Sequence, residues 1–102
     1  MFPLYTQPRT EKVWSATVVT ANGQSATFDA LNAPFVSAFG HSSAATTITL
    51  MLSSDNSNWY AGPTQVLAGA GDFCINATVG AEFVALQSLA ASATITAWIS
   101  AK

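Results

Sequence analysis

The feature that most constrains the fold is a series of short runs in which apolar and small polar residues alternate. The clearest runs are 44–52 and 93–101. Aliphatic side chains occupy every second position in both: Ile48, Leu50 and Leu52 in the first, Ile95, Ala97 and Ile99 in the second. A period of two places these side chains on one face of a strand. Each run therefore predicts a β-strand with one buried face.

Further runs rich in β-branched and aromatic residues indicate more strands, with turn-forming residues between them. These runs cover 13–20, 25–29, 35–39, 65–68, 72–76 and 82–89. Seven or eight short strands at regular spacing are typical of an all-β antiparallel β-sandwich or jelly roll.

Three turns are predicted from local residue chemistry. Asn22-Gly23 predicts a tight hairpin between the first two strands, because both residues tolerate positive φ. The polar cluster 53–58 predicts an Asx-rich turn, and Gly62-Pro63 predicts another.

Residues 1–11 are predicted to form an extended N-terminal arm, leaving residues 12–102 as a single β-sandwich domain. Pro3 and Pro8 disfavour a helix or a central strand. Phe2, Leu4 and Tyr5 make the arm too apolar for a solvated tail, so they are interface candidates. The alternative is that this segment packs on its own domain.

Charged residues make up only 8% of the 102 residues, against about 25% in an ordinary domain. The surface is therefore expected to be buried against other subunits, or to be neutral because its surroundings need no charge. The net charge is −2, and the chain holds three Lys and Arg residues in all. Without a basic patch, neither nucleic-acid binding nor attachment to an anionic membrane is expected.

No catalytic, metal or cofactor site is expected, and the chain is predicted not to be an enzyme. The single histidine, His41, precedes Ser42 without a nucleophile motif and is interpreted as a solvated turn residue. Asp72 and Glu82 could face each other across paired strands, but nothing places them in a polar cleft. One Cys and one His do not make a zinc site.

Three aromatic residues are candidates for binding. Trp98 alternates with Ile95, Ala97 and Ile99 and so points away from the core, which makes it an interface candidate. Trp59 and Tyr60 follow the polar turn and are the candidates for stacking on a glycan. Cys74 points away from its apolar neighbours, and as the single cysteine it forms no disulfide within the chain.

The second half of the chain resembles a family of small β-sandwich proteins. The matching stretches are Ser54-Asp55-Asn56-Ser57-Asn58-Trp59-Tyr60, Gly80-Ala81-Glu82-Phe83-Val84-Ala85-Leu86 and Ala93-Thr94-Ile95-Thr96-Ala97-Trp98-Ile99-Ser100. Over residues 45–101 the chain is similar to discoidin-like or jelly-roll-like virion structural proteins of tailed bacteriophages, such as capsid decoration and head-fibre proteins. It departs from them at Ala85 and Gln87, where related sequences often carry Arg or Lys. That loss of charge agrees with a surface covered by assembly.

The resemblance implies a virion protein without cofactors that assembles in the host cytoplasm, which agrees with the lack of a recognisable export signal in this sequence. Its implied partners are further copies of itself, a trimer being one such form, and a major capsid protein or other virion protein. The alternative is a carbohydrate-binding or host-adhesion module.

Overall fold

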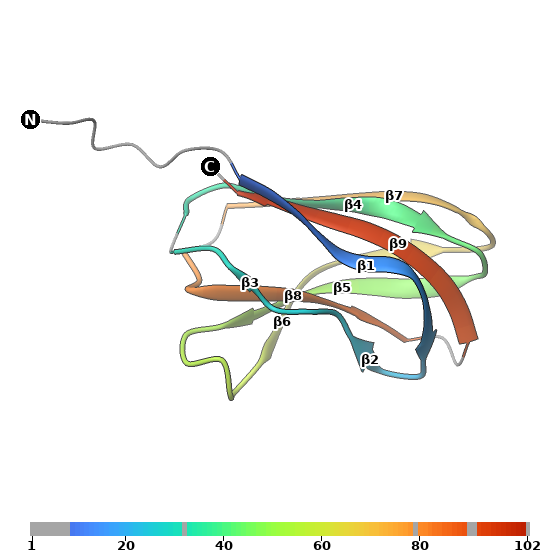
Figure 1. The fold of residues 1–102 in the computed structure, drawn as a ribbon, viewed down its shortest axis with the longest axis horizontal. Coiled ribbons are helices and arrows are strands. Elements are labelled where there is room, and N and C mark those ends of the chain that lie inside the picture. Colours follow the sequence, from blue (N-terminus) through green and yellow to red (C-terminus); the bar gives the residue numbers. More distant parts are fainter. Residues whose placement is uncertain (1–8, 32, 79, 90–91, 102) are drawn as a thin grey trace, which may run out of the picture.

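The computed structural model consists of two antiparallel β-sheets packed face to face (Figure 1). It describes residues 9–31, 33–78, 80–89 and 92–101. All the helix or strand structure in these ranges is strand, comprising β1 Arg9–Thr20, β2 Gly23–Gln24, β3 Phe28–Asp29, β4 Val36–Ser42, β5 Thr46–Ser53, β6 Tyr60–Leu67, β7 Gly71–Ala77, β8 Phe83–Ser88 and β9 Ser92–Ala101. No helix in this part of the chain is long and apolar enough to cross a membrane.

The strand order is that of a jelly roll. The four-stranded sheet runs β1-β9-β4-β7, and the five-stranded sheet runs β2-β8-β5-β6 with β3 also paired to β8. Ser25, between β2 and β3, continues the pairing, because its N–H donates to the Leu86 carbonyl (2.7 Å) and its Oγ accepts from the Leu86 N–H (2.9 Å). Counted as one interrupted strand, β2 and β3 give eight strands ordered 1-8-3-6 and 2-7-4-5. The predicted all-β sandwich or jelly roll is confirmed.

The core lies between the two sheets, where the alternating aliphatic residues meet. Its largest fully buried apolar side chains are Phe28, Ile48, Leu50, Leu86, Ile95, Ile99, Val36 and Val84. The predicted inward positions are therefore confirmed in β5, β8 and β9, with Leu52 only half-buried. Ala85 is also fully buried within the chain, so its lack of charge needs no assembly to explain it.

The predicted hairpin at Asn22-Gly23 is wrong. The turn exists, and Asn22 has φ 61°, but β1 pairs with β9 and β2 pairs with β8. The turn carries the chain from one sheet to the other. Asn22 and Gly23 specify that the chain turns here. They do not specify the partner of β1, which is β9 and pairs with it from Arg9 to Thr20.

Gly62-Pro63 also does not form the predicted turn, because both residues lie inside β6. This strand is at the edge of its sheet, and its register with β5 shifts between Thr49 and Met51. A proline is tolerated at an edge or a bulge because it has no N–H to donate. Near this bulge the Gln65 Oε1 accepts a hydrogen bond from the Cys74 N–H (3.0 Å), which joins β6 to β7.

The last three residues of the expected arm belong to the domain. β1 begins at Arg9, which pairs with Ala101 across the sheet. The Arg9 guanidinium lies 5.1 Å from the Phe28 ring centroid and donates to the Asp29 carbonyl (2.7 Å). Hydrogen bonding along β9 thus extends the domain back to Arg9. The interface candidates Phe2, Leu4 and Tyr5 lie outside the described residues.

Candidate interaction surface

A row of four side chains crosses the outer face of the four-stranded sheet. The strand registers place Lys12 opposite Trp98, Trp98 opposite Phe39, and Phe39 opposite Cys74. The residues on either side of Trp98 and Cys74 in their strands are buried in the core, as are Val13 beside Lys12 and Ala38 beside Phe39. The predicted outward orientation of Trp98 is therefore confirmed. Cys74 points away from Phe73 and Ile75 as predicted, and its side chain is exposed.

Three members of the row contact one another through the Trp98 ring. The Phe39 and Trp98 ring centroids are 5.8 Å apart with an interplanar angle of 15°, and the Lys12 Nζ lies 5.2 Å from the Trp98 ring centroid. Since the strands themselves are about 4.8 Å apart, the rings face one another and turn their edges to solvent. The surface is therefore a row of ring edges and not a flat aromatic platform.

Phe39 and Lys12 are the members of this row that the sequence did not single out, and for Phe39 a local signal existed. This signal is that Phe39 has the opposite parity to Val36 and Ala38 within the same run. Its side chain remains 37% exposed, whereas Trp98 is half-buried.

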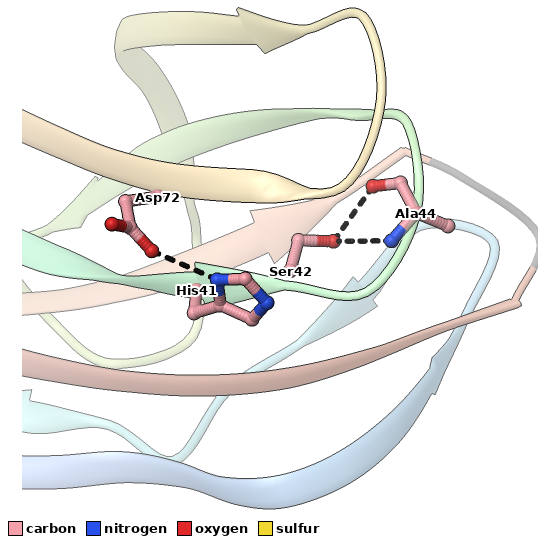
Figure 2. Close-up of polar contacts among 4 residues, drawn as sticks. All are labelled: His41, Ser42, Ala44 and Asp72. Atoms are coloured by element: carbon pink, nitrogen blue, oxygen red, sulfur yellow. Dashed lines mark hydrogen bonds and ion pairs between the residues drawn. The ribbon is translucent and has the colours of Figure 1, made fainter.

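His41 and Asp72 lie one row further along the same face (Figure 2). The His41 Nδ1 and the Asp72 Oδ1 are 2.8 Å apart, and both side chains are exposed. The interpretation of His41 as a turn residue is wrong, because β4 continues through Ser42. Asp72 does not face Glu82 either, since Asp72 is on β7 of one sheet and Glu82 lies just before β8 of the other sheet.

Ser42 does not form a catalytic pair with His41. Adjacent residues of a strand point to opposite faces, and Ser42 is fully buried. Its Oγ donates to the Ala44 carbonyl (2.8 Å) and accepts from the Ala44 N–H (3.4 Å), as Figure 2 shows. Across the described ranges, no three His, Cys, Asp or Glu side chains gather as a metal site would require.

The two glycan candidates are separated by the structure. Tyr60 is 67% exposed and lines a shallow, mostly apolar depression with Leu52, Ser53, Ser54 and Ala81. Trp59 is half-buried and does not line this depression. Of the two, Tyr60 is the more exposed side chain.

Beside Tyr60, the 53–58 loop is organised around the Asp55 carboxylate. Its Oδ1 accepts from the N–H groups of Asn58 and Ser57 (2.9 Å each) and from the Ser53 Oγ (3.1 Å), and its Oδ2 accepts from the Asn58 Nδ2 (2.9 Å). The backbone N–H of Asn58, followed by that of Ser57, holds the pKa of Asp55 well below its usual range. These bonds form the Asx-rich turn that the sequence predicted.

Asp55→Asn is expected to lower the free energy of unfolding most at neutral pH. Because the pKa of Asp55 is lowered in the folded state, its contribution is present above the ordinary carboxyl value of about 4 and is lost as the pH falls further. Denaturant unfolding of both proteins at pH 7 and pH 2.5 measures this. If Asp55→Asn lowers the free energy of unfolding by the same amount at pH 7 and at pH 2.5, the charge of Asp55 does not stabilise the fold.

Comparison with known proteins supports the fold. No protein-family model matches the chain, and no curated protein sequence matches it. Among solved structures, the SPBc2 prophage-derived protein YomS has a TM-score of 0.55 at 12% identity, with 98% of this chain and 100% of that chain covered. PirA has a TM-score of 0.50 at 10% identity, with 94% of each chain covered. The chain therefore shares its complete fold with these two proteins.

Proposed function

We propose that this chain is a structural component of a bacteriophage virion, most concretely a capsid decoration protein. It would act without catalysis or cofactors, and its partners would be further copies of itself and a major capsid protein or other virion protein. The resemblance over residues 45–101 supports the phage assignment, and the prophage origin in the name of YomS agrees with it.

The observation that carries a binding role is the composition of the outer face of the four-stranded sheet. On β4, β7 and β9 this face presents Ser37, Phe39, His41, Asp72, Cys74, Asn76, Thr94, Thr96, Trp98 and Ser100. Asp72 is the one Asp, Glu, Lys or Arg of this set, and it is already bonded to His41. On β1 the same face adds Lys12, which lies over the Trp98 ring. A partner that covers this face has few ionic groups to desolvate, and it can form hydrogen bonds with the hydroxyl and amide groups.

The proposed attachment combines this face with the N-terminal arm. Burying apolar side chains contributes roughly 25 cal/mol per Å² of area removed from water. The Thr and Ser hydroxyls around Trp98 and Phe39 can bond to a partner's backbone at the rim. Charge steering contributes little, because the chain carries so few charges.

Deleting residues 1–8 is the direct test. The truncated protein keeps Arg9 and the whole of β1, so it is expected to fold, which circular dichroism and thermal unfolding would verify. It is expected to lose co-sedimentation with capsid shells that bind the complete chain. Normal co-sedimentation of the truncated protein would contradict the attachment mechanism.

A second candidate function is carbohydrate binding, favoured by the exposed Tyr60 beside a loop rich in hydroxyl and amide groups. Tyr60→Ala is expected to abolish a glycan-array signal, whereas Leu31→Ala, at another exposed site, is expected to keep it. A wild-type protein without any such signal would remove this candidate.

A further inference from the structure

A second apolar depression lies on the five-stranded sheet, away from Tyr60. It is lined by Ala45, Thr46, Thr47, Val66, Leu67 and Leu89. Val66 is 72% exposed and Leu89 is 59% exposed, which is unusual for two large aliphatic side chains that lie close together. None of the lining residues is charged, so an apolar and uncharged occupant fits best.

This depression is at the opposite end of the sandwich from the start of β1. It lies where β5 begins and β6 ends. Leu89 follows the end of β8 and is held beside the start of β5, because its N–H donates to the Thr47 carbonyl (3.1 Å). The start of β1 pairs with the end of β9, at Arg9 and Ala101. Figure 1 shows that β1 enters at one end of the molecule and that β9 starts at the other.

We propose that this depression receives Phe2 and Leu4 from the arm of a second copy of the chain. Residues 1–8 contain no charged residue, which matches the uncharged lining. Phe2 and Leu4 are two positions apart, so an extended segment presents both on one side. This inference rests on the proposed function, because in both of them the N-terminal arm binds another protein chain.

The geometry excludes the chain's own arm from this depression. Phe2 is seven residues before Arg9, and seven extended residues span at most about 25 Å. Arg9 pairs with Ala101, so the path starts there and follows β9 to Thr94, which is level with the start of β5. These seven residues of strand span about 23 Å, and the opposite sheet, which carries the depression, is about 10 Å further away. The surface route of about 33 Å exceeds the reach of Phe2. A neighbouring copy has no such limit.

The contact is head-to-tail, because the arm and the depression are different surfaces. Such contacts close into a ring when the rotation between copies permits and otherwise continue into an open chain. A closed ring of three copies would be a trimer, one of the forms of self-association considered above.

The test uses purified protein without any shell, in sedimentation-velocity runs over a range of concentrations. The complete chain is expected to self-associate. Deletion of residues 1–8 removes the arm, and Leu89→Asp places a charge in the depression, so each variant alone is expected to be monomeric. Leu31→Asp is the matched control, since Leu31 is 53% exposed in the loop after β3 and does not line the depression, and this variant is expected to associate normally.

Mixing the two monomeric variants gives the decisive result. The truncated chain keeps the depression and Leu89→Asp keeps the arm, so together they can form one contact and are expected to give a one-to-one dimer. A mixture that stays monomeric, or a complete chain that is monomeric at every concentration, would overturn the inference. Loss of shell attachment on truncation would still support the proposed function in that case, so the two failures are distinguishable.

Discussion

Phe28→Ala is expected to lower the free energy of unfolding by about 3–5 kcal/mol, the range for removing a buried aromatic side chain. Phe28 is fully buried on β3, and the Arg9 guanidinium lies over its ring. The substitution therefore leaves a cavity and also removes a cation–π contact at the start of β1. Since a small domain has about 5–15 kcal/mol in total, this is a large share of its stability.

Phe35→Ala is the matched control, because Phe35 lies just before β4 and is 57% exposed. It is expected to change the free energy of unfolding by less than about 1 kcal/mol. Urea denaturation followed by tryptophan fluorescence measures both variants. Equal losses for the two would show that the Phe28 site collapses around the smaller side chain, contrary to the close packing described here.

Gly40→Ala is expected to destabilise the protein by about 1–3 kcal/mol, and by more if the strands cannot move apart. A Cβ at Gly40 would lie 2.1 Å from the Thr96 carbonyl oxygen and 2.7 Å from the Ala97 Cα. Both atoms belong to the backbone of β9, so no side chain can rotate to relieve the clash. β4 and β9 are the two central strands of the four-stranded sheet, and their separation would also disturb the Phe39–Trp98 stack.

Gly69→Ala provides the control for the glycine substitution. A Cβ at Gly69 meets no atom within 4 Å, and its φ is not positive, so the substitution is expected to be neutral or slightly stabilising. Thermal unfolding with the tryptophan signal compares the two variants. If Gly40→Ala unfolds at the wild-type temperature, β4 and β9 are less closely paired than the structure shows.

The fold class was predictable because burial in a sandwich leaves a direct trace in the sequence. Ile95, Ala97 and Ile99 had to alternate with polar residues to cover a core on one side only. No comparable sequence pattern shows which strand pairs with which. Asn22 promotes a turn whether the next strand joins the same sheet or the other one, so the supposed hairpin could not be distinguished from a crossing between sheets.

The candidate surface was predictable in part for the same reason. The parity of Trp98 within its strand put it on the outer face, but its partners come from strands that are distant in sequence. Phe39 and Lys12 become its neighbours only through the register of β9 with β4 and β1. The pairing of His41 with Asp72 likewise depends on the register of β4 with β7, which no local pattern encodes.

The edges of the two sheets bear on how such a protein avoids amyloid-like aggregation. An open strand edge is a template on which any passing chain can add a strand. Here β6 carries Pro63 and a bulge, the Gln65 side chain covers an N–H of β7, and β1 is interrupted by two register shifts with Ala16 at φ 46°. A chain with so little charge cannot rely on electrostatic repulsion to keep its copies apart. The irregular edges hinder strand addition between copies instead. Contacts between copies at high concentration are then expected to form through side chains, without extending the sheets.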